Sequence, residues 1–279
     1  MGTFESLNME TPEGMRTKTQ NLQGRTPEVK NKRIYLAAPA AAIAFAELMI
    51  YSGRELEAIV LHALILLGLS FSTMFIKNEE IQKTYQAFIL LPILRLVDLS
   101  MPLFYEEKLY NLIFIYGLMA IPVSIAATNQ GFTGSQLGMT FKKIGVYIPF
   151  SILVGLLLGA GEFLIVGENP LISDLSILNL LGLTIIMIFF VSPVEEIIFR
   201  SILQNRLEIV LGSREALVIT SILFGLMHSG YGNISEILYI SSVGAFLGYL
   251  FYKTRSLPLV TLIHGFMNVF FFGIIPLLL

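Results

Sequence analysis

The chain has 279 residues, of which 55% are hydrophobic and 14% are charged, and its formal net charge is −2. Soluble domains carry about 25% charged residues, so this composition is typical of a polytopic membrane protein. The balanced charge argues against nucleic-acid binding, which needs a basic surface, and the absence of cysteine excludes disulfides, thiolate metal ligands and a cysteine nucleophile.

Residues 1–33 are polar with scattered charge, and they lack the apolar core that a cleavable signal peptide needs. We expect them to form a disordered cytosolic tail. The first six residues, Met1 to Ser6, fit the N-myristoylation pattern, but a pattern this short is usually a coincidence.

The rest of the chain contains apolar stretches suited to crossing about 30 Å of hydrocarbon. They lie near 34–51, 57–76, 84–104, 109–128, 144–166, 174–191, 215–228, 235–252 and 257–277. The segment 194–212 is amphipathic, and we therefore interpret the stretches 174–191 and 215–228 as one broken helix, with a further helix over 194–212 along the cytosolic face. The prediction is an all-α transmembrane bundle of about eight membrane helices, with 34–170 as its amino-terminal part and 171–279 as its carboxyl-terminal core.

Lysine and arginine residues set the predicted orientation. Six lie in the tail and most others lie in segments on the same side, whereas the opposite side carries only Arg54 and Lys108. The positive-inside rule therefore predicts a cytosolic amino terminus. We expect a multi-pass protein of the cell membrane in contact with lipid, and the sequence leaves its oligomeric state open.

Two pairs of glycines are spaced for close helix packing. Gly155 and Gly159 fall in one predicted span, and Gly244 and Gly248 fall in another. The four-residue interval places both members of a pair on one helical face, where small residues let two backbones approach. The sequence therefore predicts two tight helix–helix contacts.

Two carboxylates and a guanidinium stand at the end of a long apolar run, in Glu195-Glu196-Ile197-Ile198-Phe199-Arg200. An ionisable group in hydrocarbon costs about 2.5–3.5 kcal/mol even on lenient insertion scales, so such groups indicate a functional site. On a helix, Glu196 and Arg200 share a face with the acid first, the favourable order for an ion pair, whereas Glu195 points about 100° away. We therefore predict that Glu196 pairs with Arg200 and that Glu195 is the free base.

The segment Ser192-Pro193-Val194-Glu195 also fits a capping box, with Ser192 as the N-cap and Pro193 at the first helical position. In that alternative a helix begins here, and Glu195 reaches back to the backbone amide of Ser192. The two interpretations are compatible, because a carboxylate at the start of a helix can still face a cavity.

Histidine is scarce, with only His62, His228 and His264 in the chain. His228 ends the run Phe224-Gly225-Leu226-Met227-His228 and precedes a turn-like Ser-Gly-Tyr-Gly-Asn segment, so its alternative role is that of an interfacial residue at a helix end. His264 lies in an apolar span four residues before Asn268, so both side chains project from one helical face. Their alternative role is an interhelical hydrogen bond that serves packing alone.

A carboxylate, two histidines and an asparagine on three carboxyl-terminal helices have the composition of a hydrolytic centre. Glu195 and His228 are expected to deprotonate a water molecule, while His264 and Asn268 donate hydrogen bonds to a developing oxyanion. Glutamate and two histidines also suit zinc, so a zinc-dependent peptidase is the alternative, although the chain lacks His-Glu-x-x-His. We expect no metal and no other cofactor.

Four other polar residues of the predicted spans are assigned structural roles. Arg95 and Asp98 are three apart on one helix, and we expect them to neutralise each other. His62 is a single histidine on an apolar helix, and Glu162 lies beside a glycine-rich packing segment. We expect neighbouring helices to satisfy both of these side chains.

Three motifs in order carry a family resemblance: Glu195-Glu196-Ile197-Ile198-Phe199-Arg200, Phe224-Gly225-Leu226-Met227-His228 and His264-Gly265-Phe266-Met267-Asn268. Over residues 180–272 the chain resembles the CAAX protease and bacteriocin-processing (abortive-infection-like) family, and it is similar to type II CAAX prenyl endopeptidases. The resemblance implies a glutamate-dependent, metal-independent intramembrane endopeptidase. Its first glutamate and first histidine would activate water, and its last histidine and asparagine would polarise the scissile carbonyl.

Carried onto this chain, the resemblance makes five residues candidates for catalysis, namely Glu195, Glu196, His228, His264 and Asn268, with Arg200 and Phe224 as supporting residues. The expected substrate is a peptide or a prenylated protein that loses its C-terminal tripeptide. Two other classes of function stay open. One is a transporter, which also buries ionisable groups near broken helices, and the other is a non-catalytic immunity protein of the same fold.

Overall fold

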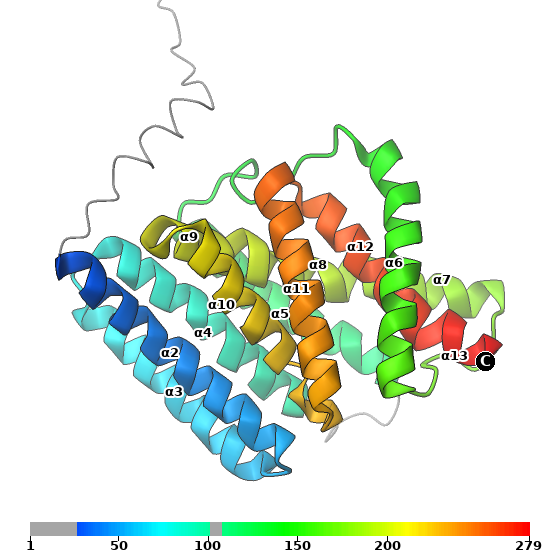
Figure 1. Cartoon of the computed structure of the whole chain (residues 1–279), viewed down its shortest axis with the longest axis horizontal. Helices are drawn as coiled ribbons and strands as arrows, with labels where there is room; N and C mark the ends of the chain where they lie inside the picture. The colour runs from blue at the N-terminus through cyan, green and yellow to red at the C-terminus, as the bar shows by residue number, and fades with distance from the viewer. Residues whose placement is uncertain (1–26, 101–107) are drawn as a thin grey trace, which may run out of the picture.

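The computed structural model describes residues 27–100 and 108–279. Its regular elements in this part of the chain are all helical (Figure 1). Seven of them are α2 (Pro27–Tyr51), α3 (Glu55–Phe75), α4 (Glu79–Ser100), α5 (Lys108–Asn129), α6 (Ile144–Val166), α10 (Ser213–Leu226) and α11 (Ile234–Thr254). A short 3₁₀ turn, η4 (Ser229–Tyr231), lies between α10 and α11.

Two further helices are composites of α-helical and π-helical segments. The first joins α7 (Ile177–Ile186), η2 (Met187–Val191), α8 (Ser192–Glu196), η3 (Ile197–Gln204) and α9 (Asn205–Leu211). The second joins α12 (Leu257–Val269), η5 (Phe270–Ile274) and α13 (Ile275–Leu278). The segments η2, η3 and η5 are π-helical.

The amino-terminal prediction needs one correction. Helix α2 begins at Pro27, so residues 27–33 of the predicted tail are helical. The remainder of that tail, residues 1–26, lies outside the described residues, and with it the myristoylation pattern. The predicted span 84–104 corresponds to α4, whose described part ends at Ser100.

Among the described helices, seven are long and apolar enough to cross a membrane, namely Lys32–Tyr51, Glu55–Phe75, Leu109–Asn129, Ile144–Val166, Ile177–Leu211, Ile234–Thr254 and Leu257–Leu278. Helix α4 has a similar length, carries more charge, and packs against α2, α3 and α5. With α4 included, the described bundle agrees with the prediction of about eight membrane helices. The protein is a polytopic α-helical membrane protein.

Outward-facing apolar side chains indicate which surfaces are suited to contact with lipid. Helix α3 illustrates the pattern, because its exposed residues recur every three or four positions and form one stripe: Leu56, Val60, Leu64, Leu67, Phe71 and Met74. Its buried residues Ala58, His62, Ile65 and Leu69 lie on the opposite face. A stripe this apolar suits contact with acyl chains.

The helix that carries Glu195 and Glu196 differs from the prediction. Residues 177–211 form one continuous helix of 35 residues, so the predicted break and the separate cytosolic helix over 194–212 are wrong. At 1.5 Å per residue such a helix is about 52 Å long, against about 30 Å of hydrocarbon. It must therefore tilt or extend beyond the apolar layer.

The capping-box alternative is also wrong. The backbone of Ser192 is helical, with φ −61° and ψ −39°, and among the described residues its side-chain oxygen finds no hydrogen-bond partner. Pro193 lies inside the helix, where its missing N–H and its ring would conflict with the carbonyl of Phe189 in a regular α-helix. The π-helical segment η2 widens the backbone just before this proline, so the helix continues through it.

Both glycine pairs lie at helix contacts, as predicted. A Cβ added at Gly159 would lie 2.6 Å from the backbone oxygen of Met267, so α6 touches the backbone of α12. A Cβ added at Gly248 would lie 2.7 Å from a methyl group of Leu217, where α11 packs on α10. Larger residues would separate these helices.

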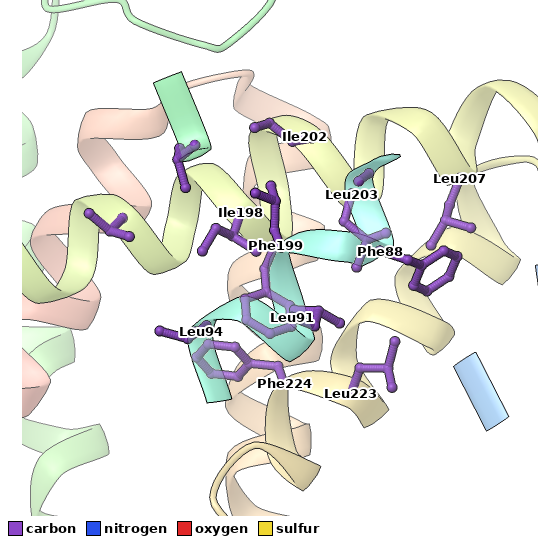
Figure 2. Close-up of a cluster of buried hydrophobic side chains, with 14 of the residues drawn as sticks. Phe88, Leu91, Leu94, Ile198, Phe199, Ile202, Leu203, Leu207, Leu223 and Phe224 are labelled. Carbon is purple, nitrogen blue, oxygen red and sulfur yellow. The ribbon is translucent and has the colours of Figure 1, made fainter. Parts of the chain in front are cut away.

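A hydrophobic core surrounds the segment that follows Glu196. Figure 2 shows Phe199 of η3 beside Leu91 and Leu94 of α4 and beside Phe224 of α10. The rings of Phe199 and Phe224 meet edge to face, with their centroids 5.0 Å apart. The core thereby joins amino-terminal helices to carboxyl-terminal ones and brings α4 next to the candidate site.

Candidate active site

One cavity brings most of the predicted site residues together. It has a volume of about 490 Å³, and its wall includes Glu195, His228, His264 and Asn268. These side chains come from α8, from the turn after α10, and from α12. The cavity is large enough for a small peptide segment, because binding pockets commonly measure about 300–1,000 Å³.

Glu196 lies behind this cavity and is fully buried. Its Oε2 atom is 3.1 Å from Nε of Arg200, so the predicted ion pair is present. Its Oε1 atom lies 2.8 Å from Nδ1 of His264. Glu196 therefore connects a guanidinium to an imidazole, which suits the orientation of His264 better than direct contact with a substrate.

The contact with Glu196 also fixes how His264 presents its ring. Because the Glu196 carboxylate accepts, Nδ1 of His264 carries the hydrogen and Nε2 faces the other way. Nε2 is 3.8 Å from Oε2 of Glu195, beyond hydrogen-bond length but close enough for a small shift or one bridging water. A carboxylate that holds one imidazole nitrogen leaves the other available for proton transfer.

Glu195 has a partner that the sequence did not reveal. The hydroxyl of Tyr116, on α5, donates a short hydrogen bond to Oε1 of Glu195, and Tyr116 also lines the cavity. The sequence gives no signal that separates Tyr116 from Tyr110, because both tyrosines lie in the same apolar span. In the structure, however, Tyr110 is 54% exposed. Only the packing of α5 against α8 makes the distinction.

His228 lies in the turn after α10, outside the seven candidate spans. Its Nδ1 atom is 3.0 Å from the carbonyl oxygen of Phe224, and since a carbonyl only accepts, Nδ1 carries the hydrogen. Burial lowers the pKa of the His228 imidazole to about 4, so the ring is neutral at pH 7. Its Nε2 atom can therefore accept a hydrogen bond.

Phe224, predicted as a supporting residue, lies close to both imidazoles. Its ring centroid is 5.5 Å from that of His228 and 5.6 Å from that of His264. The guanidinium carbon of Arg200 lies 4.2 Å from the same centroid, within cation–π range. One ring thus contacts three of the predicted polar residues and restricts their positions.

Asn268 follows His264 by one helical turn on α12, and both line the cavity from the same side, as the spacing predicted. Its side-chain amide offers two N–H donors and one acceptor. Such a group, in the same cavity as the imidazole of His264, can stabilise a developing oxyanion.

The residues assigned structural roles have more contacts than predicted. Arg95 and Asp98 do pair, with 3.0 Å between Nη1 and Oδ2, and both line the cavity. Arg95 also pairs with the buried carboxylate of Glu47, which lies 3.2 Å from Nε2 of His62. Glu162 also lines the cavity, so this side chain does not lie only at a contact between helices.

Within residues 27–100 and 108–279, no group of three or more histidine, aspartate and glutamate side chains is arranged to hold a metal ion. Both histidines of the cavity already use Nδ1, one toward a carbonyl and one toward a carboxylate. Zinc binding would therefore require the two Nε2 atoms and Glu195 to converge on one ion.

Membrane-length helices around a cavity that collects a carboxylate, two imidazoles and an amide define a multi-pass membrane protein with a candidate hydrolytic site. Residues 177–270 match the family model described as Type II CAAX prenyl endopeptidase Rce1-like. This match confirms the resemblance to the CAAX protease family over about a third of the chain, and it supports a membrane protease acting on a protein or peptide. No curated protein and no solved structure matches the chain.

Proposed function

We propose that the protein is an intramembrane endopeptidase that uses Glu195, without a metal ion, to activate the attacking water. One observation carries the proposal: Glu195, His228, His264 and Asn268, from three separate segments, line the same cavity. All four fall within the residues that match the endopeptidase family model. The proposed substrate is a prenylated CAAX protein that loses its C-terminal tripeptide.

The shared cavity and the short separation of Glu195 and His264 support the following sequence of steps. Water between Glu195 and Nε2 of His228 gives its proton to Glu195, and its oxygen attacks the scissile carbonyl carbon. The proton can pass to Nε2 of His264, 3.8 Å from Glu195, and that nitrogen then donates to the oxyanion together with the amide of Asn268. When the C–N bond breaks, the proton moves to the leaving amine, and both products are released.

Beside the charged side chains of Arg95, Asp98 and Glu162, the remaining wall of the cavity has an apolar part that suits an apolar peptide. Its apolar side chains include Leu94 of α4, Leu112 of α5 and Phe272 of η5, together with Leu171 and Met187. Apolar walls with a few polar groups are typical of sites that bind hydrophobic ligands. We place the amino terminus in the cytosol from the distribution of lysine and arginine, and we place the protein in the cell membrane.

The test is a cleavage assay with the purified full-length protein in detergent. A fluorogenic farnesylated CAAX peptide and the same peptide without the farnesyl group are compared, each with and without a chelator. Glu195→Ala and His228→Ala are the test variants. Glu208→Ala is the matched control, because Glu208 lies on the same long helix and pairs with Arg255 away from the cavity.

Chelator-resistant cleavage that is lost in both test variants and kept in the control supports the proposal. Cleavage that the chelator abolishes and zinc restores would favour the zinc-dependent alternative. Equal cleavage of both peptides would show that the prenyl group is not required, and the peptidase function would still be supported. Absence of cleavage across these and a wider panel of membrane peptides would contradict the proposal and favour the transport or immunity alternatives.

A further inference from the structure

Helices outside the family match hold the turn of His228 on both sides. The carbonyl oxygen of Met227, the preceding residue, accepts a hydrogen bond of 2.5 Å from Nη2 of Arg95 on α4. The hydroxyl of Ser229, the following residue, donates a hydrogen bond of 2.8 Å to Oε2 of Glu47 on α2. His228 therefore lies between two anchored neighbours.

The two anchoring side chains also bind each other with a two-point geometry. Nε of Arg95 is 3.0 Å from Oε1 of Glu47, and Nη2 of Arg95 is 2.6 Å from Oε2. Paired contacts of this kind fix the relative orientation of guanidinium and carboxylate. Glu47 is completely buried and Arg95 is 5% exposed, so water cannot readily replace either partner.

The turn needs such an anchor because the regular helix has already ended. Helix α10 ends at Leu226, so the carbonyl of Met227 has no helical N–H to accept from and takes its hydrogen bond from Arg95. Nδ1 of His228 makes a contact within its own segment, to the carbonyl of Phe224. That contact sets the ring orientation, whereas the contacts at Met227 and Ser229 tie the turn to α2 and α4.

From these contacts we propose that Glu47, Arg95 and Ser229 are positioning residues for His228. Charge pairs of this kind also serve helix packing, but here the same guanidinium and carboxylate reach the backbone before His228 and the side chain after it. The kinetic part of this proposal rests on the proposed peptidase function. A spectroscopic readout keeps the two proposals separable.

Ser229→Ala is the most conservative test, because it removes one hydroxyl and leaves the Glu47–Arg95 pair in place. Ser201→Ala is its matched control: both serines are completely buried, and Ser201 donates one hydrogen bond of 2.7 Å to the carbonyl of Leu137, away from the cavity. We expect Ser229→Ala to lower kcat about tenfold, since small displacements of a catalytic group cost up to about 100-fold. KM should stay within about twofold, and the control should match the wild type.

Two further measurements separate positioning from general stability. In a His228→Ala background, adding Ser229→Ala should cause no further loss of kcat, because residues that act as one unit are not additive. In the full-length protein labelled with ¹⁵N-histidine, only three imidazoles are present. We expect Ser229→Ala to shift the signal of His228 and leave that of His264 unchanged, with neither moved by Ser201→Ala.

The imidazole spectrum applies even to a protein that cleaves no peptide. If the wild-type protein cleaves no peptide but Ser229→Ala still shifts the His228 signal, the positioning role stands and only the proposed function is contradicted. An active wild type in which Ser229→Ala changes neither kcat nor the His228 signal would overturn the positioning role and keep the peptidase. The positioning role would likewise be overturned if Ser229→Ala and Ser201→Ala lowered kcat equally and each loss added to that of His228→Ala.

Discussion

Glu196→Gln tests whether His264 depends on its buried carboxylate partner. The substitution keeps the size of the side chain, but it removes the charge that contacts Nδ1 of His264 at 2.8 Å and Nε of Arg200 at 3.1 Å. A hydrogen bond to a charged group contributes about 1.5–3 kcal/mol. If the transition state loses that amount through His264, kcat falls about 10- to 150-fold at 1.36 kcal/mol per tenfold.

The same change leaves the Arg200 guanidinium buried without its counter-charge. Removing one partner of a buried pair costs about 3–5 kcal/mol of folding stability, so thermal unfolding in detergent must be measured beside activity. Replacing both partners by uncharged residues is often nearly neutral. The double variant Glu196→Gln, Arg200→Met should therefore recover stability without recovering kcat.

Glu208→Gln provides the matched control, because Glu208 also pairs with an arginine on the same long helix but lies away from the cavity. We expect it to keep the kcat of the wild type on the farnesylated peptide. A folded Glu196→Gln protein whose kcat stays within threefold of the wild type would refute the role assigned to Glu196.

Three further outcomes are expected. Tyr116→Phe removes a hydrogen bond to the Glu195 carboxylate and should lower kcat about tenfold with little change in KM, measured on the same peptide; an unchanged kcat would leave Tyr116 a packing residue. Asn268→Ala removes a predicted oxyanion donor and should lower kcat about 100- to 1,000-fold in single-turnover assays, and a loss confined to KM would argue for substrate binding instead. Gly159→Leu should overpack the α6–α12 contact, reduce the free energy of unfolding by about 1–3 kcal/mol, and lower the melting temperature. Gly68→Leu is the control, because Gly68 has open space around it and its replacement should leave the melting temperature unchanged. Equal melting temperatures for these two variants would contradict the close packing of α6 on α12.

The helices were largely predictable, because each span needs a long apolar run and such runs are visible in the sequence. The start of α3 at Glu55 and the end of α6 at Val166 lie within a few residues of the predicted limits. Pro193 misled the prediction, since a serine followed by proline is typical of a helix start. Local sequence does not show that a π-helical segment carries the helix through that proline.

The site was predictable only where its chemistry lies in compact motifs. Glu195, His228 and His264 belong to three such motifs, and all three line one cavity. That they act together stays a prediction. Tyr116 and Glu47 carry no motif, and each acquires its role from contacts between helices distant in sequence. Sequence spacing also gave Arg95 a partner only three residues away, whereas its two-point contact is with Glu47, 48 residues before it.

Glu195→Gln tests the central claim most directly, because it keeps the shape of the side chain and removes the group proposed to take the proton from water. The variant is compared with the wild type on the farnesylated peptide in the presence of a chelator, after thermal unfolding shows that it is folded. We predict that kcat falls by at least about 100-fold, the lower range for loss of a general base. A folded Glu195→Gln protein that cleaves the peptide at the wild-type rate would contradict the account.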